Sequence, residues 1–247
     1  MKKSVYKVLN AKQFAFTLCA IAVSAFLIFG VEAFYSSVSA NSETKADESR
    51  FPVIIIDAGH GGEDGGASSS SGIVEKNINL SISLKVRDLL NSLAFKTVMV
   101  RNEDKLIYDE NCKTIREKKV SDIHNRMSIM EAYPNSIFLS IHQNHFEQSK
   151  YYGAQVFYSK NNEESRMIAE RIQSSVVEKL QNENKREVKP SGTEIYLLYN
   201  AKSPAVMVEC GFLSNSGEAQ LLNDETYQTK MSLAIVDGIL NYLNNRT

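Results

Sequence analysis

Short apolar runs alternate with amphipathic stretches from residue 51 to the C terminus. Runs rich in Val, Ile, Leu and Phe predict strands, whereas apolar residues repeated every three or four positions predict helices. The expected strands are 53–56, 95–100, 136–141, 153–158, 195–199 and 205–208, and the expected helices are 77–93, 121–132, 167–180, 218–222 and 227–243. Because strands and helices alternate, we expect an α/β fold arranged as a three-layer sandwich.

The first forty residues follow a different pattern. Four lysines precede an uncharged stretch, and the small residues VSA stand directly before Asn41, as in an export signal with its cleavage site. The uncharged run 14–31 also reaches the lower limit of about 17 to 25 residues for a membrane-spanning helix. We therefore expect residues 1–40 to be a signal peptide or an N-terminal membrane anchor. Either one places the rest of the protein outside the cytoplasm, as a secreted or membrane-anchored protein.

Composition and charge narrow the remaining possibilities. Residues 41–50 are polar and charged and predict a linker, which leaves 51–247 as one folded domain. Beyond residue 40 the chain carries 24 Lys and Arg against 28 Asp and Glu, so we expect no nucleic-acid partner. Cys112 and Cys210 are too few for a disulfide framework and are expected to be small buried residues.

Three distant segments each end an apolar run with a residue suited to metal binding or proton transfer. They are DAGHGGEDGG with His60, SIHQN with His142 and VECGF with Glu209. Ligands bind beyond the carboxyl ends of strands in open α/β sheets, so we expect these three side chains to meet. Glu75 follows the glycine-rich loop, just before a helix that Asn77 or Asn79 is expected to cap.

These four residues match the requirements of a zinc hydrolase. A catalytic zinc ion typically takes three protein ligands and keeps a fourth position for water, and two histidines with one glutamate form a recognised ligand set. His60, Glu75 and His142 supply that set, so Zn²⁺ is the expected cofactor. Glu209 is the remaining carboxylate, which can take a proton from water and pass it to a leaving amine.

Each candidate also has a plain structural interpretation. A glycine-rich loop can bind phosphate, but the chain has neither G-x-G-x-x-G nor a P-loop lysine. Glu75 is the kind of acidic residue that a helix start favours, whereas Glu209 after three apolar residues would be costly to bury without a role. For His124 and His145 we expect a structural role rather than metal binding.

At this point the motifs resemble a known family. DAGHGGEDGGA, the following Glu75, SIHQN and VECGFLSN are similar, in order and spacing, to the zinc-dependent N-acetylmuramoyl-L-alanine amidases of bacterial peptidoglycan. The resemblance implies an α/β/α sandwich around a mixed sheet of about six strands. It also implies that His60, Glu75 and His142 bind zinc, that Glu209 is the catalytic acid and base, and that the enzyme hydrolyses the amide between the lactyl group of N-acetylmuramic acid and L-alanine.

The sequence departs from the family pattern at two positions. Val100 stands where Thr usually precedes Arg101, and His145 stands where a small residue usually follows the SIHxN motif. The second departure puts local packing or substrate shape in doubt rather than the metal site. No repeat resembles a wall-binding module.

The finer resemblance is to the spore-cortex amidases of endospore-forming bacteria, which are linked to germination. TIREKKVSDIHNR, YGAQVFYS and the short overall build are similar to those enzymes, which strip peptides from muramic acid so that a deacetylase can form muramic δ-lactam. A protein partner that activates the enzyme or stabilises its metal fits the same resemblance. General vegetative wall turnover is the alternative setting. The rival functions are a zinc peptidase and a wall-binding protein that has lost catalysis, although all four chemical positions are filled.

Overall fold

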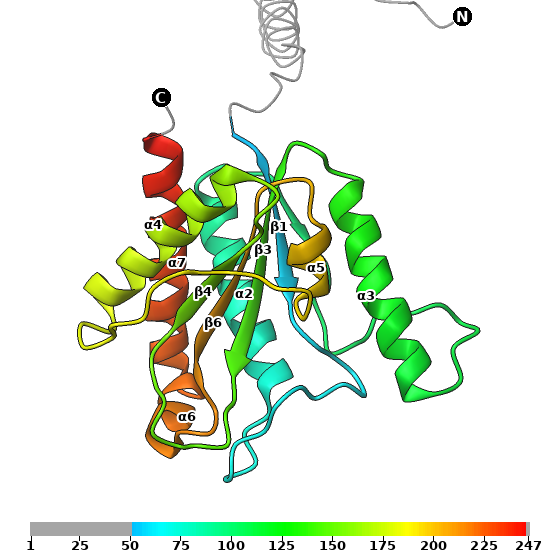
Figure 1. Ribbon diagram of the computed structural model, residues 1–247, viewed down its shortest axis with the longest axis horizontal. Coiled ribbons are helices and arrows are strands. Elements are labelled where there is room, and N and C mark those ends of the chain that lie inside the picture. Colours follow the sequence, from blue (N-terminus) through cyan, green and yellow to red (C-terminus); the bar gives the residue numbers. More distant parts are fainter. Residues whose placement is uncertain (1–50, 246–247) are drawn as a thin grey trace, which may run out of the picture. The chain divides into compact units, whose positions relative to one another are not determined.

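A six-stranded mixed sheet forms the centre of the protein. The computed structural model describes residues 51–245, so the expected signal peptide or anchor and the expected linker lie outside the described residues (Figure 1). The strands run in the order β2-β1-β3-β6-β4-β5. All neighbouring pairs are parallel except β6 and β4, so β4 and β5 run opposite to the other four strands. Their bounds are β1 Val53–Ala58, β2 Thr97–Met99, β3 Ser136–Asn144, β4 Gln155–Tyr158, β5 Lys189–Pro190 and β6 Ala205–Phe212.

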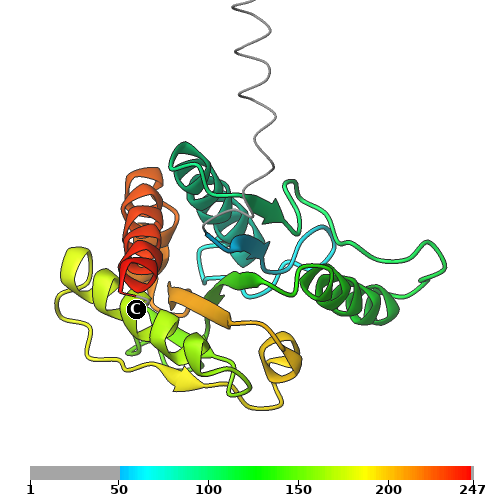
Figure 2. The same ribbon diagram turned by 90° about the horizontal axis from the view of Figure 1, so that it is seen from above.

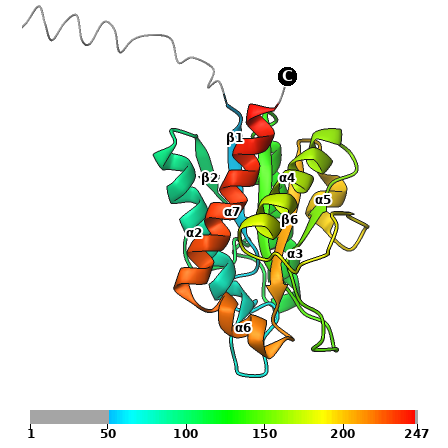
Figure 3. The same ribbon diagram turned by 90° about the vertical axis from the view of Figure 1, so that its left-hand side faces the viewer.

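Helices cover both faces of this sheet and complete the three layers that the sequence predicts. Figures 2 and 3 show α2, α4 and α7 together against one face, with α3 and α5 against the other. The helices are α2 Glu75–Ser92, α3 Ile115–Glu131, α4 Glu163–Lys179, α5 Tyr196–Asn200, α6 Ser216–Leu222 and α7 Glu225–Asn244. Within the described residues, none of these helices is both long enough and apolar enough to cross a bilayer.

Alternate residues of the central strands divide between two apolar cores. Ile54 and Ile56 of β1 pack with α2, α4 and α7, whereas Ile55 between them packs with α3 and α5. This follows from the two-residue period of a strand, whose successive side chains point to opposite faces. A sheet buried on both faces therefore appears in the sequence as an uninterrupted apolar run.

The predicted strand at 195–199 is wrong, because this segment forms the short helix α5. Leu197 and Leu198 are both buried in the same core cluster, which consecutive residues of a strand would not be. An apolar run this short does not distinguish strand from helix by its period. The sixth strand is instead the two-residue edge strand β5, whose Lys and Pro carry no apolar signal.

Two further expectations are corrected at α3 and Cys112. Helix α3 begins at Ile115, six residues before the predicted start, because Thr114 and Glu117 form a capping box. Its first turns are charged and show no apolar period, which hid them in the sequence. Both cysteines of the described residues are free, and Cys210 is buried as expected, but Cys112 is partly exposed.

Candidate metal site and catalytic carboxylate

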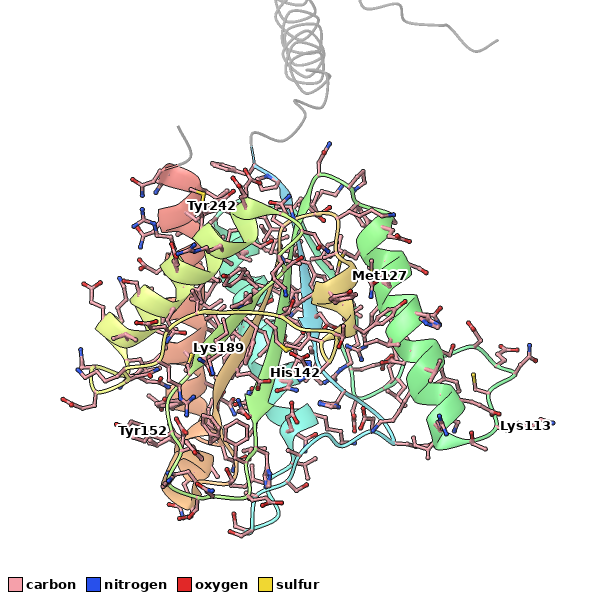
Figure 4. All side chains as sticks on the ribbon, in the orientation of Figure 1. Lys113, Met127, His142, Tyr152, Lys189 and Tyr242 are labelled. Atoms are coloured by element: carbon pink, nitrogen blue, oxygen red, sulfur yellow. The ribbon has the colours of Figure 1, made fainter. Side chains whose placement is uncertain are left out.

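Three side chains of the metal-binding type converge beyond the sheet's carboxyl edge. His60 lies two residues after β1, and Glu75 is the first residue of α2. His142 lies near the end of β3 and is labelled in Figure 4. The Oε1 atom of Glu75 lies 3.3 Å from Nε2 of His60 and 3.0 Å from Nδ1 of His142. Nitrogen and oxygen ligands at about 2.0–2.1 Å from one tetrahedral ion lie about 3.3 Å apart, so the three residues fit a zinc site.

The glycine-rich loop shapes this cluster through its backbone. His60 itself adopts a φ of 61°, in the left-handed region that residues other than glycine rarely occupy. Gly66 has a φ of 67°, and a Cβ atom there would lie 2.5 Å from Oε2 of Glu75 and 2.6 Å from Cδ2 of His60. Glycine at position 66 therefore lets the loop fold back onto two members of the cluster.

Hydrogen bonds fix the carboxylate of Glu75. Its Oε2 accepts from the backbone N–H of Ala67 at 2.8 Å, and its Oε1 accepts from the backbone N–H of Gln143 at 3.1 Å. The side chain of Asn79 donates to the same Oε1 at 3.1 Å and to the carbonyl of Gly59 at 3.1 Å. The expected capping role is therefore wrong: α2 has no side-chain cap, and Asn79 orients Glu75 instead.

Asp64 orients the ring of His60 from the opposite side. The Oδ2 atom of Asp64 lies 2.7 Å from Nδ1 of His60, which directs Nε2 toward Glu75. A carboxylate on the distal nitrogen of a metal-binding histidine is a common support, because it fixes the tautomer and the ring orientation. The sequence carries Asp64 four residues after His60, but its role becomes visible only in the folded loop.

The cluster has strongly perturbed protonation equilibria. Burial opposes a charge on His60, yet its hydrogen bonds to Asp64 and Glu75 and the negative charges of both raise its pKa to about 9. Burial also opposes a charge on Glu75, but hydrogen bonds to His142 and His60 bring its pKa far below the usual range. Glu75 is therefore ionised at neutral pH, as a metal ligand must be.

Glu209 lies beside the cluster on the neighbouring strand. His142 and Glu209 are directly paired residues of β3 and β6, so their side chains leave the same face of the sheet. The Oε2 atom of Glu209 is buried and has no hydrogen-bond partner within residues 51–245. Burial, with a further contribution from the negative charge of Glu75, raises the pKa of Glu209 to about 7 against the opposing influence of His142 and His60. A carboxylate with this pKa can both accept and donate a proton near neutral pH.

Two buried arginines position the loop, and neither was singled out as functional in the sequence. Arg101 donates to the carbonyls of Ala58 and Gly59 at 2.8 and 2.9 Å, and Arg126 donates to the carbonyls of Ala58 and His60 at 3.0 and 2.9 Å. Arg126 also forms an ion pair with the buried Asp57. The sequence did contain a signal for them: Arg101 directly follows a predicted strand and Arg126 lies inside a predicted helix, and a charge buried in either place needs a partner.

The cluster opens into a cleft of about 430 Å³. His60 and His142 form part of its wall, and Ile195, Tyr196 and Met207 form an apolar part. A concave site with a few polar groups on an apolar wall is the usual form of a substrate site.

The other two histidines lie apart from this cluster. The ring of His124, on α3, lies 5.6 Å from the ring of Tyr196, and His145 is exposed just beyond β3. Within residues 51–245, the three-residue cluster that could hold a metal contains neither of them.

Comparison with known proteins identifies the family. The family model described as N-acetylmuramoyl-L-alanine amidase matches residues 54–241. The germination-specific N-acetylmuramoyl-L-alanine amidase of Bacillus subtilis is 34% identical over 194 residues, which cover 78% of this chain and 81% of that protein. The CwlD amidase from Clostridioides difficile, solved in complex with the GerS lipoprotein, has a TM-score of 0.76 at 45% identity and covers 78% of this chain and 99% of its own.

A second solved structure agrees with this assignment. The N-acetylmuramoyl-L-alanine amidase from Clostridium difficile 630 has a TM-score of 0.69 at 26% identity and covers 81% of this chain and all of its own, 100%. The expected α/β fold and the family resemblance are therefore confirmed. The chain belongs to the N-acetylmuramoyl-L-alanine amidase family and is a peptidoglycan amidase.

Proposed function

We propose that this amidase depends on zinc bound by His60, Glu75 and His142, with Glu209 as its catalytic acid and base. One observation carries the proposal: ligand-type atoms of His60, Glu75 and His142 all lie within 4.8 Å of one another, beside a buried Glu209 oxygen that has no hydrogen-bond partner in residues 51–245. Zinc bound there would lower the pKa of its water to about 7 and polarise the carbonyl of the scissile amide.

The residues of the chain then account for the proton transfers. Glu209 accepts the proton of the attacking water, and its raised pKa near 7 allows it to hold that proton. It delivers the proton to the nitrogen of L-alanine as the amide bond breaks, because an unprotonated amine is a poor leaving group. Glu75 cannot take this role, since both of its oxygens already accept hydrogen bonds and its pKa is far below the usual range.

Product analysis tests the reaction. Purified peptidoglycan is digested with the protein, with and without added zinc, and the products are identified by mass spectrometry. Stem peptides that begin with a free L-alanine amine, together with unsubstituted glycan, are expected. Cleavage only within the peptides would identify a zinc peptidase instead.

Variants of the site separate metal binding from catalysis. Glu209→Gln is expected to retain zinc and lose turnover, whereas His142→Ala is expected to lose both. His124→Ala, on α3 and outside the three-residue cluster, is the matched control and should retain both. Stoichiometric zinc and normal activity in His142→Ala would disprove the assigned ligands, and full activity in Glu209→Gln would remove Glu209 from the mechanism.

We further propose that the enzyme acts in maturation of the spore cortex. The support is its similarity to the germination-specific amidase of Bacillus subtilis and to the CwlD amidase of Clostridioides difficile. In that setting it removes peptides from muramic acid, and a deacetylase then allows muramic δ-lactam to form. Loss of muramic δ-lactam from the cortex of a deletion strain is the expected result. Normal cortex with altered vegetative muropeptides would favour wall turnover.

The proposed site of action is outside the cytoplasm, which for a cortex enzyme is the space between the forespore membranes. Residues 1–40 would direct export and be removed or remain as an anchor. A protein partner is also proposed, because the relative from Clostridioides difficile was solved with a lipoprotein. Zinc titration of the isolated protein tests this idea: weak binding and low turnover are expected, whereas full zinc occupancy and high turnover would make a partner unnecessary.

A further inference from the structure

A partly buried arginine lies at the end of a row of side chains that begins in the proposed active site. His142 on β3 pairs with Glu209 on β6, which in turn pairs with Gln155 on β4. The three side chains therefore form a row on one face of the sheet. The Nη1 atom of Arg186 donates to Oε1 of Gln155 at 3.2 Å. Because neighbouring strands are about 4.7–4.9 Å apart, Gln155 lies about 10 Å from His142.

The guanidinium of Arg186 is anchored by hydrogen bonds and ring contacts, and the charge of Glu218 acts on it without forming an ion pair. Its Nε donates to the carbonyl of Tyr152 at 2.8 Å, and its central carbon lies 4.5 Å from the ring centroid of Phe212 and 5.9 Å from that of Tyr151. Tyr152 is labelled in Figure 4, to the left of His142. Across residues 51–245, no carboxylate forms an ion pair with Arg186, and no hydrogen bond engages its Nη2.

These contacts prepare Arg186 to bind an anion. A guanidinium whose Nε, Nη1 and aromatic face are already occupied loses little freedom when a ligand arrives, which favours binding. The open Nη2 edge can donate to a carboxylate, and charge-assisted bonds of this kind are stronger than neutral ones. Neighbouring Lys185 is exposed, and within residues 51–245 its side chain has no comparable anchoring contact.

The separation of about 10 Å between His142 and Gln155, whose side chain accepts from Arg186, is comparable to the length of the leaving half of the substrate. An extended chain advances about 3.3–3.6 Å per residue, so the second and third residues of a stem peptide lie about 7–10 Å from the scissile amide. Peptidoglycan stems carry carboxylates at these positions. We propose that Arg186 binds a free carboxylate of the leaving stem peptide and makes the enzyme prefer stems in which that carboxylate is not amidated.

This inference rests on the proposed roles of His142 and Glu209, and two synthetic muropeptides test it. They differ only in the α-carboxylate of the second stem residue, which is free in one and amidated in the other. We expect the wild-type protein to show a KM about 10- to 100-fold lower for the free carboxylate, as one charge-assisted contact predicts. Arg186→Ala should raise the KM for that substrate until the ratio between the two substrates approaches one. Arg186→Lys, which keeps the charge without the planar fork, should show an intermediate ratio, and the matched control Lys185→Ala should keep the wild-type ratio.

The alternative is a purely structural clamp between β4 and the loop before it. In that case Arg186→Ala would impair both substrates equally and leave their ratio unchanged, which overturns the inference. Equal KM values in the wild-type protein overturn it too. If urea unfolding shows that Arg186→Ala is not folded, Arg186→Lys and Arg186→Gln are compared instead, because the first keeps the positive charge and the second removes it. Failure of the wild-type protein to release stems that begin with L-alanine would instead overturn the proposed function, so the two failures are distinguishable.

Discussion

Adding one methyl group at Gly66 should disable the metal site while leaving the fold in place. The new Cβ atom would lie 2.5 Å from Oε2 of Glu75, and ordinary contacts begin at 3.4 Å. Either Glu75 or the loop must therefore move by roughly 1 Å, a misplacement that can lower a rate by about 100-fold. The same Cβ lies 2.6 Å from Cδ2 of His60, so two proposed ligands are displaced together.

Backbone strain also accompanies this substitution, and the chain offers a control for it. Gly66 and Gly72 both adopt positive φ values, of 67° and 82°, in the same loop region. A Cβ at Gly72 meets nothing within 4 Å, so Gly72→Ala introduces strain without displacing a ligand. We expect each variant to lose about 1–2 kcal/mol of stability from the left-handed conformation alone.

The assay compares three quantities in the two variants. Urea unfolding with a chelator present gives stability, zinc titration gives affinity, and hydrolysis of a defined muropeptide gives kcat/KM. Gly66→Ala should lose at least about 10- to 100-fold in zinc affinity, as for a disturbed metal support, and about 100-fold in kcat/KM. Gly72→Ala should lose neither. Equal activity losses in the two variants would assign the effect to strain, and wild-type zinc affinity in Gly66→Ala would refute the placement of the ligands.

Three further predictions follow from the polar groups around the site. Glu209→Gln should stabilise the metal-free protein progressively as pH rises from about 4.5 to 7, by up to about 3 kcal/mol. Over this range the unfolded wild-type carboxyl ionises while the buried folded one, with its pKa raised to about 7, stays protonated, so only the wild-type protein loses stability. A pH-independent difference in urea unfolding would contradict this. Asp64→Asn should weaken zinc binding about 10- to 100-fold, and unchanged affinity in a titration would show that Asp64 does not support His60. Arg126→Met should lower stability by about 3–5 kcal/mol, because it leaves Asp57 buried and unpaired; a loss below 1 kcal/mol in urea unfolding would mean that the pair contributes little.

The chemical residues of the site were easier to predict from the sequence than the residues that hold them in place. His60, His142 and Glu209 each follow an apolar run, and β-strands that read as apolar runs bring their carboxyl ends to one edge. The supporting residues carry no such signal. Arg126 reaches the carbonyl of His60 from a helix 66 positions further along the chain, and Asn79 reaches Glu75 from within a helix expected to use it as a cap.

The errors in secondary structure have the same origin. A run of five apolar residues near position 197 has no period long enough to separate strand from helix, so packing against α3 determines its conformation. The charged start of α3 shows no apolar face, and its capping box at Thr114 determines where it begins. The edge strand β5 forms from Lys189 and Pro190 because β4 offers it hydrogen-bonding partners, which are invisible along the chain.

The sequence by itself determined the fold class, the family, and the four residues with suitable chemistry, because apolar periodicity and ligand-bearing motifs are local properties of the chain. Only the tertiary structure decided that ligand-type atoms of His60, Glu75 and His142 lie within 4.8 Å of one another, and that one oxygen of Glu209 is buried without a hydrogen-bond partner in residues 51–245. It also placed Arg186 in line with the site across the sheet. These last facts depend on strand register and on desolvation, which arise only when distant segments pack together.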